Sequence, residues 1–270
     1  MSIFNVAGIQ LSVAALTDRG LRRPVNEDAF MADGPAFVVA DGIGGYERGE
    51  LASAAVVAAF SAHLSGDHLG EFADVHAALL DADDRVARIA VGTTRGTGST
   101  ATGTVLVSHE GQPFWLIFNV GDSRVYRHLG SELTQLTVDH SLGQEMVDAG
   151  VMAAGDLATF KDRHLITRAI GANDSLADSW LVPVVNGERL LLCSDGLYGE
   201  VDDESIRAVL TMNGRTETVA QVLVDRAKAN GGHDNITVVV IDVVSGGDDA
   251  HTDDATGSAS SANLDDTLQA

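Results

Sequence analysis

The sequence predicts an α+β fold, in which a central antiparallel β-sandwich of two sheets is flanked by pairs of α-helices in four layers, α-β-β-α. Strand-like runs follow one another and the helical segments come in pairs, whereas a doubly wound sheet alternates strand and helix. Continuous apolar runs such as "LLLC" and "TVVVI" are typical of strands covered on both faces. We see no internal repeat and no linker that would split this core.

Short β-rich runs separated by turns account for most of the core. Eight segments have the β-branched and apolar composition of strands. In chain order they are residues 9–16, 36–41, 100–109, 114–121, 123–129, 180–185, 189–195 and 235–243.

Four segments have the spacing of amphipathic helices. Residues 48–64 are Ala-rich, with a predicted inner stripe of Leu51, Ala55, Ala58, Ala59 and Ala62. Residues 74–91 place Val75, Leu79, Val86 and Ile89 at helical spacing, with charges opposite. Residues 203–212 and 216–229 follow in tandem, with Asp203 and Thr216 as expected N-caps and with Val219 and Leu223 on the inner face of the second.

The composition limits the classes of partner and compartment. The 270 residues carry 39 acidic and 17 basic side chains, a formal net charge of -22, which argues against a nucleic-acid partner and against docking on anionic lipid. Cys193 is the single cysteine, which fits a reducing compartment, and we expect it to be a buried small hydrophobe. No signal peptide or bilayer-spanning run is apparent, so we expect a cytoplasmic protein. The sequence leaves the oligomeric state open, with a monomer as the default expectation.

The chain divides into a core and a tail. Residues 1–244 contain all the predicted strands and helices. Residues 245–270 are rich in Ser, Gly, Asp and Ala and have no apolar periodicity. Such a segment cannot bury enough surface to offset its ordering entropy, so we expect an acidic disordered tail.

Carboxylates stand next to predicted apolar strands at five places. They are Glu27 and Asp28 in "VNEDAF", Asp41 in "VVADGIGG", Asp122 in "NVGDSR", Asp195 in "LCSDGL" and Asp234 in "GGHDNITVVV". A single Asp-Gly pair more often forms a turn in which the Asp bonds its own backbone. Asp41 and Asp195 differ because they follow "FVVA" and "LLCS", which are too apolar to be surface edges.

These strand-end carboxylates predict a metal site. An ionised carboxylate at the end of a buried strand is costly unless something pairs it, and few cations stand nearby in the sequence. Ligation by oxygen alone suits Mg(II) or Mn(II), and no His/Cys cluster has zinc spacing. Nucleotide-binding loops do not explain "DGIGGYERGE", because Glu47 stands where a dinucleotide fingerprint needs its last glycine and no Gly-Lys-Ser/Thr follows.

Seven stretches together resemble the metal-dependent serine/threonine protein phosphatases, the type-2C or PPM family, in its bacterial branch. They are "TDRGLRRPVNEDAF", "FVVADGIGG…GELAS", "GTGSTATGTVL", "FNVGDSRVYRHLGSELTQLTVDHSL", "HLITRAIG", "LLLCSDGL" and "GGHDNITVVVIDV". They occur in the family's order and cover roughly residues 10–243. Each fragment alone is a weak signal, but seven in sequence are very specific.

The resemblance implies a two-metal site at one end of the sandwich, with Mn(II) or Mg(II) activating a water for attack on a phosphoester. Asp41 would bridge both metals, and the Gly42 carbonyl, Asp195 and Asp234 would complete the direct shell. Glu27 and Asp28 would act mainly through metal-bound waters. Arg23 matches the arginine that clamps the substrate phosphate, which its planar guanidinium can bind in a bidentate way.

The sequence departs from the family's pattern at three places. Ile43 stands where many eukaryotic members have a His that is a candidate general acid, so the proton donor is left open; His140 is one alternative, although we favour a structural role for it. Gly199 replaces a frequent acidic ligand of a third metal, which leaves that site doubtful although Asp122 remains. Tyr46 stands where many bacterial members carry His, and Glu47 with Arg48 would pair at a helix start.

Residues 141–171, called the flap below, would move and select protein substrates according to the resemblance. Arg168, within the flap, is either a residue on the phosphate side or part of an ordinary ion pair. The function implied is a phosphoprotein phosphatase that opposes a bacterial Ser/Thr kinase. Two alternatives stay open: a non-catalytic pseudophosphatase signalling module and a phosphatase for small phosphoesters.

Overall fold

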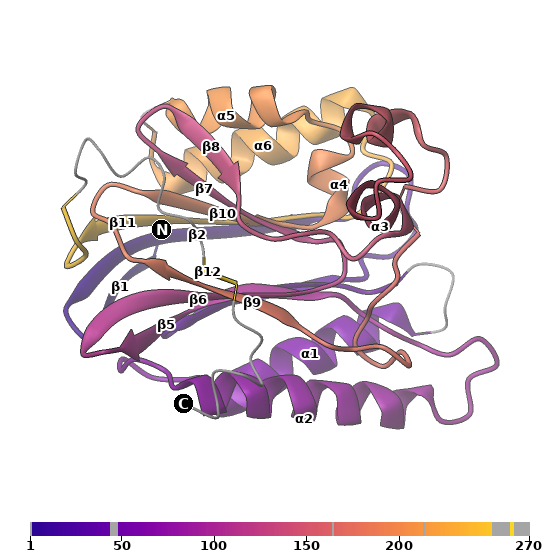
Figure 1. Cartoon of the computed structure of the whole chain (residues 1–270), viewed down its shortest axis with the longest axis horizontal. Helices are drawn as coiled ribbons and strands as arrows, with labels where there is room; N and C mark the ends of the chain where they lie inside the picture. The colour runs from indigo at the N-terminus through magenta and orange to yellow at the C-terminus, as the bar shows by residue number, and fades with distance from the viewer. Residues whose placement is uncertain (1, 44–47, 164, 213, 250–259, 262–270) are drawn as a thin grey trace.

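Two six-stranded antiparallel sheets pack face to face in the computed structural model, which describes residues 2–43, 48–163, 165–212, 214–249 and 260–261 (Figure 1). The first sheet has the order β1 (Ser2–Val6), β2 (Ile9–Asp18), β11 (Ile236–Ser245), β10 (Arg189–Cys193), β7 (Arg124–Leu129) and β8 (Glu132–Gln135). The second has the order β12 (Ser260–Ser261), β9 (Asp178–Pro183), β6 (Gln112–Val120), β5 (Ala101–His109), β4 (Ala36–Asp41) and β3 (Asp28–Asp33). All eight predicted strands are present, and the sandwich is confirmed.

Each sheet is covered on its outer face by a pair of helices, as predicted (Figure 1). The second sheet packs against α1 (Gly49–His63) and α2 (Phe72–Ala90), and the first against α5 (Asp203–Thr211) and α6 (Thr216–Asn230). Three apolar layers result. Trp115 is fully buried between the sheets, Phe60 stacks on Phe118 at 4.8 Å under α1, and Leu223 is fully buried beneath α6.

Of the predicted inner stripe of α1, Ala59 is buried and Ala55 is partly buried, but Leu51, Ala58 and Ala62 are exposed. Ala52, Val56, Ala59 and Phe60 are fully buried, whereas Leu51 is 47% exposed. This helix is apolar nearly all round, so its periodicity cannot show which face meets the sheet. The stripe of α2 holds for its buried positions Val75, Leu79 and Val86.

Both expected N-caps were one residue late. Asp202 caps α5, because its carboxylate accepts a hydrogen bond from the Ser205 amide at 2.7 Å. Arg215 stands at the N-cap of α6 without a side-chain bond, while the Thr216 hydroxyl lies 3.3 Å from the Ser12 hydroxyl. Asp202 and Asp203 are equally suitable N-caps from the sequence alone, and the backbone conformation at the start of α5 decides which of them caps the helix.

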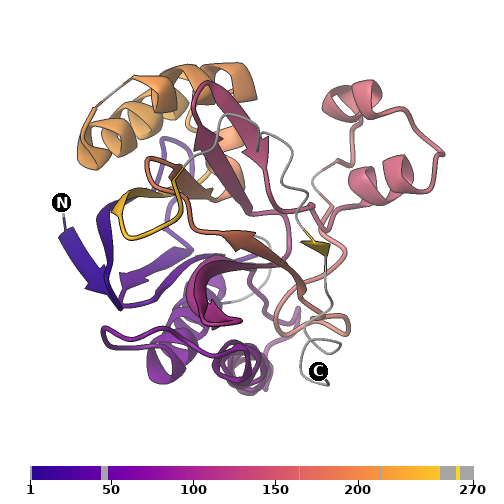
Figure 2. The same ribbon diagram turned by 60° about the vertical axis from the view of Figure 1, so that its left-hand side comes forward.

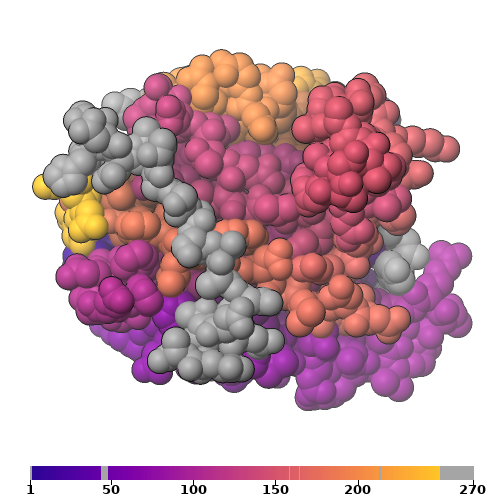
Figure 3. Space-filling model, viewed as in Figure 1, coloured from indigo at the N-terminus to yellow at the C-terminus, as the bar shows by residue number. Residues whose placement is uncertain are grey.

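The flap projects from one end of the sandwich. It contains α3 (Leu142–Asp148) and the 3-10 helix η1 (Ala154–Thr159), and these stand clear of both sheets in two views (Figures 1 and 2). The space-filling view shows this segment as a lobe at the right-hand end (Figure 3).

The predicted tail makes contacts where it is described. β11 continues to Ser245, the Asn186 amide donates to the Asp248 carbonyl at 2.8 Å, and Ser260–Ser261 pair with β9. Residues 250–259 and 262–270, on which most of the disorder prediction falls, lie outside the described residues. Within the part of the chain that the structure describes, none of the helices has the length and apolarity to cross a bilayer.

Candidate metal and phosphate site

Five predicted aspartates come from strand ends of both sheets. Asp28 begins β3 and lies opposite Asp41, the last residue of β4, in the antiparallel register. Asp195 follows β10 as the first residue of α4 (Asp195–Tyr198), and Asp234 lies two residues before the start of β11. Asp122 lies in the turn between β6 and β7. Antiparallel pairing within each sheet, together with the packing of the two sheets, thus gathers carboxylates that are up to about two hundred residues apart in sequence.

Asp28 is held by a chain of hydroxyl groups. Its Oδ2 accepts hydrogen bonds from the Ser194 hydroxyl at 2.8 Å and the Thr237 hydroxyl at 2.7 Å. The Asn26 amide donates to the Thr17 hydroxyl, which lies 2.7 Å from that of Thr237. The opposite oxygen, Asp28 Oδ1, is buried and has no hydrogen-bond partner. One oxygen is therefore fixed in place while the other is left for a ligand.

Burial and mutual repulsion raise the pKa values of these carboxyl groups. Burial, followed by the charge of Asp234, raises the pKa of Asp28 to about 6. Burial, followed by the charge of Asp139, raises the pKa of Asp122 to about 7, against the opposing effect of Arg124. Burial and the neighbouring carboxylates also hold the pKa values of Asp41 and Asp195 well above their usual range. The positive charges nearby therefore do not fully compensate the cluster.

Glycines let the backbone pass close to the carboxylates. A Cβ atom on Gly42 would lie 2.3 Å from the Gly49 carbonyl oxygen and 2.7 Å from that of Glu27. A Cβ on Gly49 would lie 2.7 Å from the Glu27 carboxylate, and one on Gly196 would lie 1.9 Å from the Asn235 carbonyl oxygen. A Cβ atom at Gly42 or Gly196 would therefore force the backbone that carries the site to move, whereas one at Gly49 would displace the Glu27 carboxylate.

Arg23 reaches the cluster from the loop before β3. Its Nη2 donates to Asp234 Oδ2 at 2.5 Å. Burial alone would lower the pKa of the Arg23 guanidinium. The negative charges of Asp234, Asp195 and Asp41 outweigh this effect, so the pKa of Arg23 is raised. The predicted phosphate-binding arginine and the predicted metal carboxylates therefore share one site. Glu27 faces the same region, since burial raises its carboxyl pKa and Arg23 opposes that rise.

The donor set fits a divalent cation, although the side chains are not placed as its ligands. Among the described residues, no three or more His, Cys, Asp or Glu side chains form a group arranged to hold a metal ion. Asp195 Oδ1, like Asp28 Oδ1, is buried without a hydrogen-bond partner. Unpaired carboxylate oxygens, raised pKa values and an all-oxygen environment are what a hard cation such as Mg(II) or Mn(II) would compensate.

His140 has a structural role. It is 5% exposed, its Nδ1 accepts from the Gly121 amide at 3.2 Å, and its Nε2 lies 3.3 Å from Asp178 Oδ2. The Arg168 guanidinium forms an ion pair with the same Asp178 at 2.9 Å and lies 3.6 Å from Asp174. Of the two alternatives for Arg168, the structure shows the ion pair. Together these side chains tie the base of the flap to the turn before Asp122.

Two of the positions that depart from the family's pattern can be placed. The Ile43 amide donates to the Gly98 carbonyl at 3.1 Å, and Ile43 lines a cavity of about 630 Å³ at the base of the flap. Gly199 follows α4 and brings no ligand atom beyond its backbone. Tyr46 and Glu47 lie outside the described residues, so the expected pair of Glu47 with Arg48 cannot be placed. Arg48 itself donates to the Ile89 carbonyl at 3.3 Å.

Sequence reasoning missed the polar side chains that support the carboxylates. Asn235 accepts from the Glu27 amide at 2.8 Å and donates to the carbonyls of Arg19 and Val25. It therefore fixes the loop that carries Arg23. Ser194 and Asn235 could have been identified from the sequence, because each is directly adjacent to a predicted metal carboxylate, Asp195 or Asp234. Cys193 is buried, as expected, and burial raises the pKa of its thiol.

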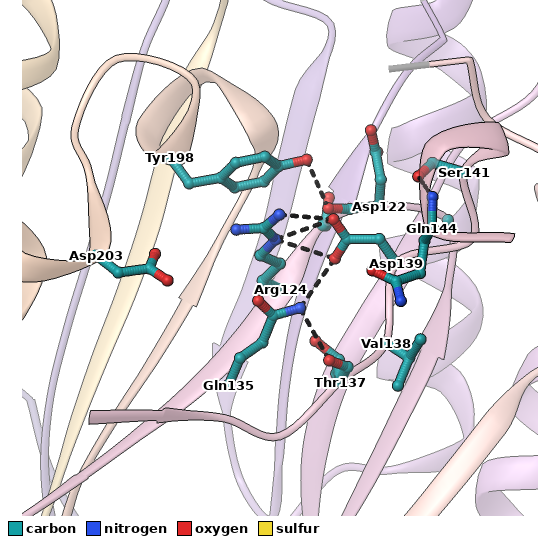
Figure 4. Close-up of polar contacts among 12 residues, drawn as sticks. Asp122, Arg124, Gln135, Thr137, Val138, Asp139, Ser141, Gln144, Tyr198 and Asp203 are labelled. Atoms are coloured by element: carbon teal, nitrogen blue, oxygen red, sulfur yellow. Dashed lines mark hydrogen bonds and ion pairs between the residues drawn. The ribbon is translucent and has the colours of Figure 1, made fainter. Parts of the chain in front are cut away.

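Arg124 is the centre of a second network that sequence reasoning did not identify. Its guanidinium makes three hydrogen bonds to the Asp139 carboxylate, between 2.7 and 3.1 Å, and lies 3.7 Å from the centre of the Tyr198 ring. The Tyr198 hydroxyl donates to the Asp122 carbonyl at 2.8 Å (Figure 4). This network joins β7, the entry to the flap and α4 directly behind the carboxylate cluster.

Comparisons with known proteins give one consistent result. The sequence profile of the family described as protein phosphatase 2C matches residues 22–231. The serine/threonine protein phosphatase PstP of Mycobacterium tuberculosis is 38% identical over 241 residues, which are 87% of this chain and 45% of that protein. The serine/threonine phosphatase stp of Listeria welshimeri is 31% identical over 84% of this chain and 93% of that protein. The chain thus spans less than half of PstP and nearly all of stp.

Solved structures agree with these sequence relatives. The crystal structure of the Mycobacterium tuberculosis PstP/Ppp phosphatase has a TM-score of 0.80 and 35% identity, covering 87% of this chain and 99% of that one. The catalytic domain of PstP in complex with two manganese ions has a TM-score of 0.76 and 33% identity, with the same coverage.

Proposed function

The chain belongs to the protein phosphatase 2C family, and from this membership and its carboxylate site we propose that it is a metal-dependent serine/threonine protein phosphatase. The observation that carries the proposal is the group of five aspartates gathered beside Arg23, with unpaired buried oxygens on Asp28 and Asp195. The two manganese ions in the PstP catalytic domain support a two-metal site in this chain.

The residues of the chain divide the work between metal binding and phosphate binding. Asp41, Asp195, Asp234 and the Gly42 carbonyl would hold two Mn(II) or Mg(II) ions directly, and Glu27 with Asp28 would hold them through water. When bound, such ions acidify a water molecule and neutralise charge on the phosphoryl oxygens. No Ser or Cys nucleophile is then required.

Arg23 would change partners during the reaction. Its guanidinium now pairs with Asp234. A phosphate dianion would offer the Arg23 guanidinium two oxygen acceptors and more negative charge than Asp234 does, so we infer that Arg23 would turn from Asp234 to the phosphate of a bound substrate. Arg23 then orients the phosphoryl group for in-line attack.

The substrates we propose are phosphoserine and phosphothreonine proteins, and the physiological role is to oppose a Ser/Thr kinase in the cytoplasm. The relatives support the substrate class, since PstP and stp are both serine/threonine phosphatases. The single buried cysteine supports a reducing compartment.

Hydrolysis of a phosphothreonine peptide by metal-depleted protein, with and without added Mn(II), tests the proposal. We expect activity only with Mn(II) and its loss in Asp195→Ala, while Asp67→Ala, an exposed aspartate on another loop, retains it. Calorimetric titration should show Mn(II) binding to the wild type at micromolar concentrations. Activity that persists in excess chelator would refute the proposal, and absence of Mn(II) binding would favour a non-catalytic module.

A further inference from the structure

A cavity of about 400 Å³ lies between the flap and the sandwich. Ser141, Ala154, Leu157 and Arg163 line it from the flap, and Arg124, Asp139, Tyr198 and Gly199 line it from the sandwich. It adjoins the carboxylate site, because Tyr198 and Gly199 closely follow Asp195 and the Tyr198 hydroxyl bonds the Asp122 carbonyl (Figure 4).

The charges around this cavity do not cancel. Arg124 and Asp139 neutralise one another through their three hydrogen bonds, and the Tyr198 ring covers the guanidinium (Figure 4). Arg163 makes only a 3.4 Å hydrogen bond to the Phe160 carbonyl, and no acidic side chain among the described residues pairs with it. Among the described residues that line the cavity, two arginines and one aspartate therefore leave the Arg163 charge without a lining carboxylate to pair with, in a chain whose net charge is -22.

Gly199 keeps the wall facing this charge open. Within 4 Å of a Cβ atom placed there, the structure has only the Asp195 carbonyl group, with its oxygen at 2.9 Å. The position contributes neither bulk nor a carboxylate that could neutralise Arg163. On the flap side, Ala154 and Leu157 supply an apolar wall.

We propose that this cavity is a substrate subsite that binds an acidic side chain near the phosphorylated residue, with Arg163 as the specificity-determining residue. The inference rests on the proposed phosphatase function. A protein substrate whose phosphate lies at the carboxylate site must pass over the adjoining surface, and this cavity lies beside it. The apolar wall packs against the methylene groups of a Glu or Asp side chain, and the Arg163 guanidinium donates a charge-assisted hydrogen bond to its carboxylate.

The test uses phosphothreonine peptides in which one Glu is moved along the flanking positions, each with a Gln counterpart. For the Mn(II)-loaded wild type we expect kcat/KM to be about tenfold higher for Glu than for Gln at one or two neighbouring positions, mainly through KM. Arg163→Gln should bring this ratio near one, and Arg163→Lys should retain part of it. Using the ratio cancels any general loss of activity in a variant.

Arg226→Gln is the matched control. Arg226 also bonds only a backbone carbonyl, that of Ser205 at 3.5 Å, but it lies on α6 and does not line this cavity. It should keep the wild-type ratio. Circular dichroism and thermal melting establish that each variant is folded.

Peptide affinity in chelator, measured by fluorescence anisotropy, separates the subsite from catalysis. A Glu preference in binding that is lost in Arg163→Gln supports the subsite even if turnover fails, in which case the proposed function alone is wrong. Equal affinity and equal turnover of Glu and Gln peptides at every position would overturn the subsite. So would an Arg163→Gln variant that keeps the wild-type ratio.

Discussion

Replacing Asp122 with Asn should stabilise the metal-free protein, and only at higher pH. Asp122 is 3% exposed, and its pKa is raised to about 7, first by burial and then by Asp139, against the effect of Arg124. The ordinary value is 3.8. Because the folded state binds this proton more tightly than the unfolded state, the folded protein loses stability as the pH rises from 3.8 through 7.

The magnitude follows from that difference. Each pH unit corresponds to 1.36 kcal/mol, so ionised Asp122 costs about 4 kcal/mol above pH 7 and less than about 1 kcal/mol near pH 4. Asn has nearly the same shape and does not ionise. The substitution also removes the charge that, after burial, does most to raise the pKa of Asp195. We therefore expect the unfolding free energy of Asp122→Asn to exceed that of wild type by up to about 4 kcal/mol at pH 8.

Urea unfolding in excess EDTA, at several pH values between 4 and 8, measures this difference. Asp67→Asn, at an exposed position, is the control and should track the wild type at every pH. The test lies in how the difference in unfolding free energy between Asp122→Asn and wild type depends on pH. A difference that is the same at every pH would reflect only the packing of the new side-chain amide. A gain that is equal at pH 4 and pH 8, or absent at pH 8, would refute the electrostatic explanation.

Three other substitutions test the phosphate contact, the glycine packing and a helix cap. Arg23→Lys keeps a charge beside Asp234 but loses the planar fork, so KM for a phosphopeptide should rise about tenfold in steady-state assays; an unchanged KM would contradict the assigned role. Gly196→Ala would place a Cβ 1.9 Å from the Asn235 carbonyl oxygen, and should lower the unfolding free energy by about 1–3 kcal/mol and weaken Mn(II) binding in calorimetry. Asp202→Ala removes the side-chain cap of α5 and should lower the urea concentration at the unfolding midpoint, whereas an unchanged midpoint would argue against the cap.

The sequence predicts the fold well because its strands and helices differ in composition. The long apolar strands were recognised within a few residues, whereas β1, β3 and β8 were missed as strands because these edge elements are short or mixed in polarity. The inner face of α1 could not be predicted, since its small residues give no contrast between faces. Such choices depend on packing against partners that are distant in sequence.

The site was predictable in its carboxylates but not in its supporting contacts. Each acidic residue stands beside an apolar strand in sequence, which is a local signal. The hydroxyl groups of Ser194 and Thr237, by contrast, meet Asp28 only in the folded sandwich, where the register of β10 and β11 in the first sheet places them together and β3 of the second sheet packs against them. The network of Arg124 likewise joins segments that no local pattern connects.

The order of strands in the first sheet has a consequence for biosynthesis. β11 lies between β2 and β10, yet it is the last strand of that sheet in the chain. After β2 and β10 have left the ribosome, each has an open, strongly apolar edge until β11 emerges. Open strand edges of this kind are prone to aggregation. Asp234 leaves the ribosome just ahead of this strand, so the nascent chain completes its central strand and its last carboxylate together. A partly synthesised chain therefore has neither a closed sheet nor a complete site with which to capture cations.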